Sequence, residues 1–263
     1  MKEDNNVKIR VSQLEKTFRN TGGETTQALV SVNLEVHEGE FVCLLGPSGC
    51  GKSTLLNIMA GFKRPSRGEV LIDGRRVTAP DPRYVTLFQN YGLFPWRNVL
   101  GNVEYGLEVQ GVPKEGRRRV ANQYISLVGL DKFIYNHPHE LSGGMQQRVA
   151  LARALAVDPE IIFMDEPLGA LDAITRIRLQ EEISRIWRNK EKTIVFVTHD
   201  IEEAVFLADR IVVMTPCPGR VKSTIPVPMG RPRHRTHPDF VRVRDQVYVE
   251  LQLEEEEILD YHS

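Results

Sequence analysis

The stretch FVCLLGPSGCGKST, Phe41–Thr54, decides which fold the chain is expected to adopt. Its first five residues are apolar, as in a strand buried on both faces of a parallel sheet. GPSGCGKST then matches the pattern G-x-x-x-x-G-K-[ST], and the helical pattern after it stops at Gly61. This order predicts a loop whose backbone N–H groups point at phosphate oxygens, in the favourable field of a helix N-terminus.

Within this loop, Lys52 is expected to reach the β- and γ-phosphates of a nucleotide, and the Ser53 hydroxyl to hold Mg²⁺. The alternative, a chance glycine-rich turn, is disfavoured by the flanking strand and helix. Cys50 is expected to be an inert loop residue whose alkylation would block nucleotide entry. The residues predicted to bind the nucleotide here are Gly46, Pro47, Ser48, Gly49, Cys50, Gly51, Lys52, Ser53 and Thr54.

Strand and helix patterns alternate along most of the chain. Short β-like stretches fill Lys8–Val36, and Asp73-Gly74 between two strand-like runs predicts a type I′ hairpin. The apolar strands IIFMD, TIVFVT and RIVVMT (Ile161–Asp165, Thr193–Thr198 and Arg210–Thr215) are separated by helical stretches. This alternation predicts an α/β fold with a mostly parallel sheet covered on both faces.

Two segments depart from that alternation. From Asn98 to Val157 helical patterns dominate, which indicates a helical insertion. After Thr215 the chain is proline-rich and basic, then acidic at Glu254–Glu257, which favours a solvated appendage. Whether Arg231–His237 regulates the protein or only keeps the tail soluble stays open. The expected organisation is one domain over residues 8–220, with its insertion at about 98–157, and a tail at 221–263.

Bulk composition excludes several classes of protein. The chain has 263 residues, 41% of them hydrophobic, which is too many for a disordered chain. A net charge of -1 gives no general attraction to nucleic acid. Three cysteines without framework spacing indicate a reducing compartment, and MKEDNNVKIR is no secretory signal. No apolar run is long enough to span a bilayer, so any membrane role would need another polypeptide.

Polar side chains at strand ends supply candidate catalytic groups. Asp165 ends an apolar strand, where a Mg²⁺-binding carboxylate is expected, and Glu166 could orient and deprotonate an attacking water. His199 could hydrogen-bond the γ-phosphate or that water, and the Gln89 amide could bind Mg²⁺ or water. Taken alone, these residues could equally cap helices or serve the core. The predicted catalytic set is Lys52, Gln89, Glu166 and His199, and the predicted metal set is Ser53, Gln89 and Asp165.

A second anion site is indicated by LSGGMQQRVALARAL, Leu141–Leu155. A serine and two glycines open a strong helical pattern, and the hydroxyl and bare amides at such a helix start suit an anion. A chain with one complete phosphate loop has no evident use for it.

The set GPSGCGKST, Gln89, LSGGMQQ, IIFMDE, GALD (Gly169–Asp172) and His199, in this order, resembles the ATPase subunits of ABC transporters. The resemblance covers about residues 8–220. It implies a P-loop NTPase (RecA-like) core with a parallel sheet, an N-terminal antiparallel β subdomain and an inserted helical subdomain. It also implies ATP and Mg²⁺ as ligands, and ATP hydrolysis.

The same resemblance gives the second anion site a use. In such ATPases two subunits pack head to tail, and each ATP lies between the phosphate loop of one and the LSGG helix of the other. Ser142, Gly143 and Gly144 would therefore bind the γ-phosphate of a partner's nucleotide, and Asp172 would couple the two sites near the dimer axis. Phe18 resembles the aromatic residue, usually tyrosine, that stacks on adenine. A homodimer is expected, although two different ATPase chains remain an alternative.

FQNYGLFPWRNV (Phe88–Val99) and PGRV (Pro218–Val221) are similar to the nitrate/sulfonate/taurine importers. This class implies import of a small anionic solute such as nitrate, a sulfonate, taurine or bicarbonate, on the cytoplasmic face of the membrane. A separate permease is the expected direct partner, and a periplasmic or extracellular solute-binding protein an indirect one. One or two of the loop's apolar side chains could belong to the core, but four favour a permease-binding surface: Tyr91, Leu93, Phe94 and Trp96.

Three other functions fit the sequence less well. ABC ATPases that act on DNA or ribosomes usually carry a coiled-coil insertion or two cassettes, which this sequence lacks, so no nucleic-acid partner is expected. A kinase or GTPase would leave LSGG unexplained. An ATP-dependent scaffold without catalysis is disfavoured by the strand-end acid, base and histidine together.

Overall fold

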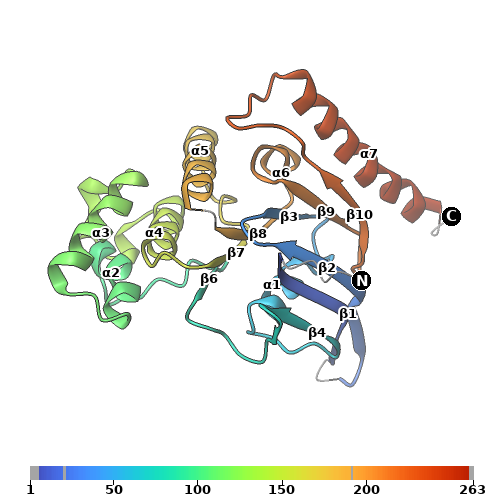
Figure 1. Ribbon diagram of the computed structural model, residues 1–263, viewed down its shortest axis with the longest axis horizontal. Helices are drawn as coiled ribbons and strands as arrows, with labels where there is room; N and C mark the ends of the chain where they lie inside the picture. Colours follow the sequence, from blue (N-terminus) through green and yellow to red (C-terminus); the bar gives the residue numbers. More distant parts are fainter. Residues whose placement is uncertain (1–5, 20–21, 191, 261–263) are drawn as a thin grey trace. The chain divides into compact units, whose positions relative to one another are not determined.

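Figure 1 shows a computed structural model, which describes residues 6–19, 22–190 and 192–260, the segments 188–190 and 252–260 by their main chain only. The chain divides into two compact units, Met1–Pro82 with Lys190–Ser263, and Arg83–Asn189. We call them the first and the second unit and describe each by itself. Of the helices in the described ranges, none combines the length and apolar character needed to cross a membrane.

An antiparallel sheet forms the N-terminal part of the first unit, with strand order β2-β1-β4-β5. The strands are β1 (Val7–Arg19), β2 (Thr25–His37), β4 (Arg67–Ile72) and β5 (Arg75–Arg76). Asp73 and Gly74 join β4 to β5 with φ angles of 51° and 71°, the two left-handed conformations that a type I′ turn requires. The predicted hairpin is thus confirmed.

The second sheet of the first unit contains the strands with the most apolar sequences. β3 (Phe41–Leu45) pairs in parallel with β8 (Thr193–Thr198) and with β9 (Arg210–Met214), and β10 (Val221–Pro226) pairs antiparallel with β9. Every residue of β3 and β8 is buried. Helix α1 (Lys52–Met59) follows β3, and α6 (Ile201–Leu207) follows β8, so the predicted strand–loop–helix order is present.

The segment after Thr215 is not the solvated appendage that its composition favoured. Besides β10, it forms helix α7 (Pro238–Asp260), which packs on α6 and β9. Phe240, Val243 and Val247 are buried on one face of α7, at the spacing of a helical stripe. The prediction is wrong because these apolar residues are interspersed with arginines and aspartates, so that average composition hides the stripe. The domain boundary at residue 220 stays a prediction.

The second unit holds two parallel strands, β6 (Tyr84–Leu87) and β7 (Ile161–Asp165). Its helices are α2 (Val99–Val109), α3 (Lys114–Leu127), α4 (Gly143–Ala156) and α5 (Ala173–Lys190), with 3₁₀ turns η1 (Asp131–Phe133) and η2 (Pro138–Glu140). Helix α2 packs on α3 and α4. In the region predicted as a helical insertion, the described residues thus form three helices and two short turns.

Candidate functional site

The loop between β3 and α1 curls around a buried lysine. Lys52 is only 5% exposed, and its Nζ donates hydrogen bonds to the carbonyl oxygens of Gly46 (2.7 Å) and Pro47 (2.8 Å). Gly49 and Gly51 have φ angles of +80° and +94°, which side chains with a Cβ rarely adopt. A loop closed around an ammonium group in this way is suited to phosphate oxygens.

PGRV supports this loop from beneath, a contact that the sequence analysis missed. Gly219 N donates to Ala28 O (2.9 Å), and Gly219 O accepts from Val30 N (3.0 Å). A Cβ on Gly219 would overlap the Cys50 carbonyl, so only glycine fits here. The signal in the sequence was a glycine inside a short motif far from the loop.

Cys50 has no exposed surface, and its Sγ lies 3.7 Å from Lys52 Nζ. A thiol reagent therefore reaches it only when the loop opens. Cys43, in β3, is also buried, and burial raises the pKa of its thiol well above the usual value. Neither thiol is placed as a nucleophile, in agreement with the expectation that Cys50 is an inert loop residue.

His199 lies in an exposed turn directly after β8. Thr198 Oγ1 donates to Glu203 Oε2 (2.7 Å) and accepts from Asp200 N (3.0 Å). Asp200 in turn caps α6, because its Oδ1 accepts from Glu203 N (3.0 Å). The residues on both sides of His199 are thus fixed by hydrogen bonds, and His199 itself is exposed.

Phe18, the predicted adenine-stacking residue, is half-buried on β1. The ammonium groups of Lys16 and Lys63 lie 5.1 and 5.2 Å from its ring centroid. The ring is therefore next to positive charge, which suits a nucleotide that carries phosphates.

In the second unit, Glu166 has an unusual backbone. It directly follows β7 and has a φ of 47°, a left-handed conformation that costs a non-glycine residue about 1 kcal/mol or more. Its carbonyl accepts hydrogen bonds from Gly169 N (3.3 Å) and from Gln147 Nε2 (3.2 Å). Two hydrogen bonds to its carbonyl oxygen therefore hold the strained residue, which lies at the position predicted for the general base. Asp165, the end of β7, is buried.

Gln147 is a residue whose importance the sequence analysis missed. It lies on α4, is buried, and bridges the turn after β7 by donating to Glu166 O and accepting from Ala170 N (3.2 Å). It connects the helix that LSGG opens to the predicted base. The available signal in the sequence was a glutamine inside the LSGGMQQ motif, since an amide that becomes buried needs hydrogen-bond partners.

Helix α4 begins differently from α1. The Ser142 Oγ accepts from Met145 N (3.3 Å), and Ser142 and Gly143 are exposed. A Cβ on Gly143 would approach the Tyr91 hydroxyl, and one on Gly144 the Ala170 carbonyl (3.3 Å). The N-terminus of α4 is thus exposed at Ser142 and Gly143, with the Tyr91 hydroxyl beside Gly143.

Asp172 lies at the start of α5, where its Oδ1 accepts from Thr175 N (3.0 Å). This hydrogen bond lowers the pKa of the Asp172 carboxyl. Within the second unit, Asp172 therefore acts as the N-terminal cap of α5.

The loop after Gln89 borders an apolar groove of about 340 Å³ in the second unit. Arg153, from α4, donates to Gly92 O (2.8 Å) and Tyr91 O (3.1 Å), and its guanidinium lies 5.5 Å from the Phe94 ring centroid. Of the four residues predicted to bind a permease, Tyr91 and Phe94 line the groove. Trp96 is 72% exposed and packs on Phe94, whereas Leu93 is outside the lining.

The predicted residues are thus divided between the units. The first unit holds the phosphate loop, Phe18 and His199, and the second holds Gln89, Asp165 and Glu166, together with Ser142–Gly144 and Asp172. Among the described residues, no three His, Cys, Asp or Glu side chains gather as a metal site. The predicted metal set of hydroxyl, amide and carboxylate oxygens fits Mg²⁺, which keeps waters and phosphate oxygens as further ligands.

Comparison with known proteins gives the family. Residues 29–169 match the family model "ABC transporter". An uncharacterised ABC transporter ATP-binding protein of Methanocaldococcus jannaschii is 50% identical over 241 residues, which are 92% of this chain and 90% of that protein. The taurine import ATP-binding protein TauB of Roseobacter denitrificans is 42% identical over 258 residues, 95% of this chain and 96% of that protein. The bicarbonate transport ATP-binding protein CmpC of Synechococcus elongatus is 44% identical over 246 residues, 91% of this chain and 37% of its own length.

Solved structures agree with the sequence comparisons. A dimeric bacterial ABC transporter cassette has a TM-score of 0.78 at 37% identity, and covers 84% of this chain and 100% of that one. A dimeric cassette in a post-hydrolysis state with ADP and Pi gives 0.77 at 36% identity, with the same coverage. These neighbours confirm the α/β P-loop NTPase fold. The chain therefore belongs to the ABC transporter family, as an ATP-binding cassette ATPase of the nitrate/sulfonate/taurine class.

Proposed function

We propose that this chain is the ATP-hydrolysing subunit of a bacterial-type importer and that it works as a head-to-tail pair. The observation that carries the proposal is the open start of α4, where Ser142 and Gly143 are exposed while Lys52 is enclosed by its own loop. The exposed Ser142 hydroxyl and the N–H groups of the first turn of α4 are suited to the phosphate of a nucleotide that another chain carries. A second copy, aligned as in the dimeric cassettes, would bring its nucleotide to them.

Each side chain has a distinct part in the proposed reaction. Lys52 binds the β- and γ-phosphates, and Ser142 with the N-terminus of α4 adds donors from the opposite chain. Glu166 takes a proton from the attacking water, and His199 donates to the γ-phosphate. Mg²⁺, held by Ser53, Gln89 and Asp165, would supply charge neutralisation on the phosphates. Phe18 stacks on the adenine, and Asp172 couples the two sites of the pair.

A size measurement of the Glu166→Gln variant tests the pairing. The variant keeps the hydrogen bonds to the Glu166 main chain but lacks the base, so ATP should bind, stay intact and hold two chains together. Light scattering should give a monomer without nucleotide and twice that mass with Mg·ATP. A Glu166→Gln chain that hydrolyses ATP at the normal rate, or that stays monomeric with ATP, would contradict the proposal.

The transported solute is proposed from the relatives. The taurine and bicarbonate proteins are 42% and 44% identical to this chain, so the proposed cargo is a small solute with an anionic group, such as taurine, another sulfonate, nitrate or bicarbonate. The cargo would pass through a separate permease, supplied by a solute-binding protein, with this subunit on the cytoplasmic face. A homodimer is the simplest assembly, and a pair of two different ATPases is the alternative.

We also propose that the apolar groove beside the loop after Gln89 receives a helix of that permease. Its wall presents the aromatic rings of Tyr91, Phe94 and Tyr105 next to the exposed Trp96, which suits an amphipathic helix. The Trp96→Ser variant should keep the ATPase rate of the isolated chain and lose co-purification with the permease. Tyr135→Ser, at an aromatic residue that is 67% exposed and outside the groove lining, is the matched control. Equal loss of co-purification in both variants would refute the proposal that the groove binds the permease.

A further inference from the structure

The segment Pro228–Arg235, in the first unit, binds the C-terminal end of helix α6. An α-helix leaves its last four carbonyl oxygens without partners inside the helix. In α6 these belong to Val205, Phe206, Leu207 and Ala208, because the last helical hydrogen bond runs from Ala208 N to Ala204 O.

Two arginines supply donors to all four carbonyls. Arg233 Nη1 donates to the oxygens of Val205 (2.7 Å), Phe206 (3.2 Å) and Ala208 (2.6 Å). Arg231 Nη2 donates to Leu207 O. Arg233 Nη2 also donates to Val227 O and Met229 O, both at 3.3 Å, so the guanidinium ties its own segment to the helix end.

The electrostatics of this contact are those of a buried charge. The side chains of Arg233 and Arg231 are 1% and 8% exposed, and Asp209 is the carboxylate that both approach, at 3.9 and 3.0 Å. Burial, together with the nearby charge of Arg231 and against the opposing effect of Asp209, lowers the pKa of the Arg233 guanidinium to about 10. The negative end of the α6 dipole offsets part of the cost of burying two cations.

His199 lies at the other end of the same helix. Helix α6 has seven residues, too few to be stable without contacts at its ends. At its start, Asp200 and the Thr198–Glu203 hydrogen bond fix the turn that carries His199, and at its end the two arginines hold the carbonyls. A rotation or shift of α6 would therefore move the turn.

We infer that Arg231 and Arg233 act as a clamp on α6 and are positioning residues for His199 in ATP hydrolysis. The inference about hydrolysis rests on the proposed role of His199, whereas the clamp itself is a claim about α6. The basic tail segment, whose purpose the sequence left open, thereby gains a function in the site.

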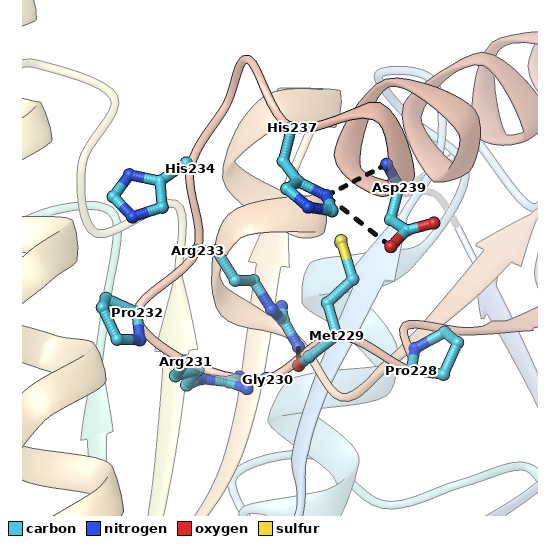
Figure 2. A pocket seen from close by; sticks show the side chains of 9 residues that line it. All are labelled: Pro228, Met229, Gly230, Arg231, Pro232, Arg233, His234, His237 and Asp239. Carbon is cyan, nitrogen blue, oxygen red and sulfur yellow. Dashed lines mark hydrogen bonds and ion pairs between the residues drawn. The ribbon is translucent and has the colours of Figure 1, made fainter.

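Figure 2 shows the pocket that Arg231 and Arg233 help to line. Arg233 and His234 leave the segment in opposite directions, and Arg233 borders a cavity of about 370 Å³ together with Met229 and the paired His237 and Asp239. A small cation can enter this cavity from solvent and reach the site of a deleted guanidinium.

The test compares Arg233→Lys with Arg235→Gln in the full chain. Lysine keeps the charge, but its single nitrogen cannot replace both Nη1, which donates to the α6 carbonyls, and Nη2, which donates to Val227 O and Met229 O. Arg235 supplies the control, because its guanidinium contacts the Phe206 ring and Glu202. Amide hydrogen exchange in residues 198–208 should rise about tenfold or more in Arg233→Lys, the factor expected for losing hydrogen bonds to a charged group, and stay normal in Arg235→Gln. The kcat should fall by a similar factor, with ATP affinity unchanged because the phosphate loop is intact.

Unchanged exchange in residues 198–208 of Arg233→Lys would overturn the clamp. Raised exchange with a normal kcat would overturn the positioning of His199, provided that His199→Ala is inactive. If His199→Ala hydrolyses ATP normally, the proposed role of His199 in hydrolysis is refuted. Hydrogen exchange in residues 198–208 then tests the clamp on α6 by itself.

Chemical rescue gives a second, independent readout. In Arg233→Ala, guanidinium ion at a few millimolar, far below denaturing concentrations, should restore exchange protection of residues 198–208 and part of the kcat. Methylammonium, which has the charge without the planar set of donors, should not. Equal effects of both cations would overturn the clamp, because simple charge replacement would then explain the recovery. Should Arg233→Ala fail to fold, the two cations are compared in the Arg231→Gln variant instead, which loses the guanidinium that donates to Leu207 O.

Discussion

Helices α1 and α4 both have glycines at their starts, yet their first turns are built differently. Before α1, the left-handed Gly51 caps the helix without a side-chain hydrogen bond, and Lys52 bends back to the carbonyls of its own loop. Before α4, Ser142 is extended and exposed, and its hydroxyl caps the helix. The start of α1 forms an enclosure. The start of α4 forms an open surface, to which a ligand must be brought.

This difference gives the two predicted anion sites of the chain different tasks. An enclosed loop can bind the phosphates of a nucleotide unaided, with its lysine already buried. An open N-terminus offers a favourable field and donors, but no walls that retain a ligand. We therefore expect damage to α1 to abolish binding and damage to α4 to abolish only turnover.

The largest effect is expected at the enclosed helix start. Lys52→Ala removes the cation around which the loop closes and the donor to the phosphates, so ATP affinity and turnover should both collapse. We expect the ATPase rate to fall about 100-fold or more. Fluorescent-nucleotide titration and phosphate release would measure both quantities. Lys132→Ala, at an exposed lysine of η1, should match the unaltered chain. Normal nucleotide affinity in Lys52→Ala would mean that the loop does not bind phosphate.

A smaller effect is expected where α4 meets the predicted base. Gln147→Leu leaves the Glu166 carbonyl without its amide donor, which should relax the strained backbone and lower kcat about tenfold at unchanged ATP affinity. The unfolding free energy should fall by about 1–3 kcal/mol. The control is Gln146→Leu, which loses hydrogen bonds to Pro138 and Leu141 but none to the Glu166 turn. If the two variants lose kcat equally, Gln147 has no special link to the base.

At Phe18 the comparison concerns affinity alone. Phe18→Ala should raise the KM for ATP about three- to tenfold with kcat unchanged, because stacking on an aromatic ring contributes that much binding energy. Phe18→Tyr retains the ring and should behave like the unaltered chain. Steady-state kinetics with ATP would measure the difference, and an unchanged KM in Phe18→Ala would exclude the ring from adenine binding.

The smallest effect concerns the thiols. Cys217 is exposed, whereas Cys43 and Cys50 are buried, and the raised pKa of Cys43 keeps its thiol protonated at neutral pH. A chromogenic thiol reagent should therefore label one cysteine of the folded chain within minutes and all three after unfolding. Fast labelling of two or three thiols in the folded protein would show that the phosphate loop opens readily.

Local patterns in the sequence predicted local structure well. IIFMD and TIVFVT form strands with the expected bounds, and Asp73-Gly74 forms the expected turn, because each depends on neighbouring residues only. Two contacts could not be predicted in this way: that of Gly219 with the phosphate loop, and that of Arg231 and Arg233 with the end of α6. Both contacts join segments that are far apart in the chain, and their residue types are common in ordinary loops.

Glu166 illustrates the same limit at the site itself. Its position after an apolar strand predicted a candidate base, since strand ends gather polar groups at one edge of a sheet. Its left-handed backbone is held by the amide of Gln147, a contact between α4 and the turn after β7 for which the sequence has no local signal.

The central claim, that each reaction site needs two chains, is tested most directly by mixing two inactive variants. Ser142→Arg blocks the open start of α4, and Lys52→Ala disables the enclosed loop, so each pure variant should be inactive. Random pairing in an equal mixture makes half of the dimers mixed, each with one intact site of two. The account predicts recovery of roughly a quarter of the normal ATPase rate. A mixture as inactive as its components, although the two chains pair, would contradict it.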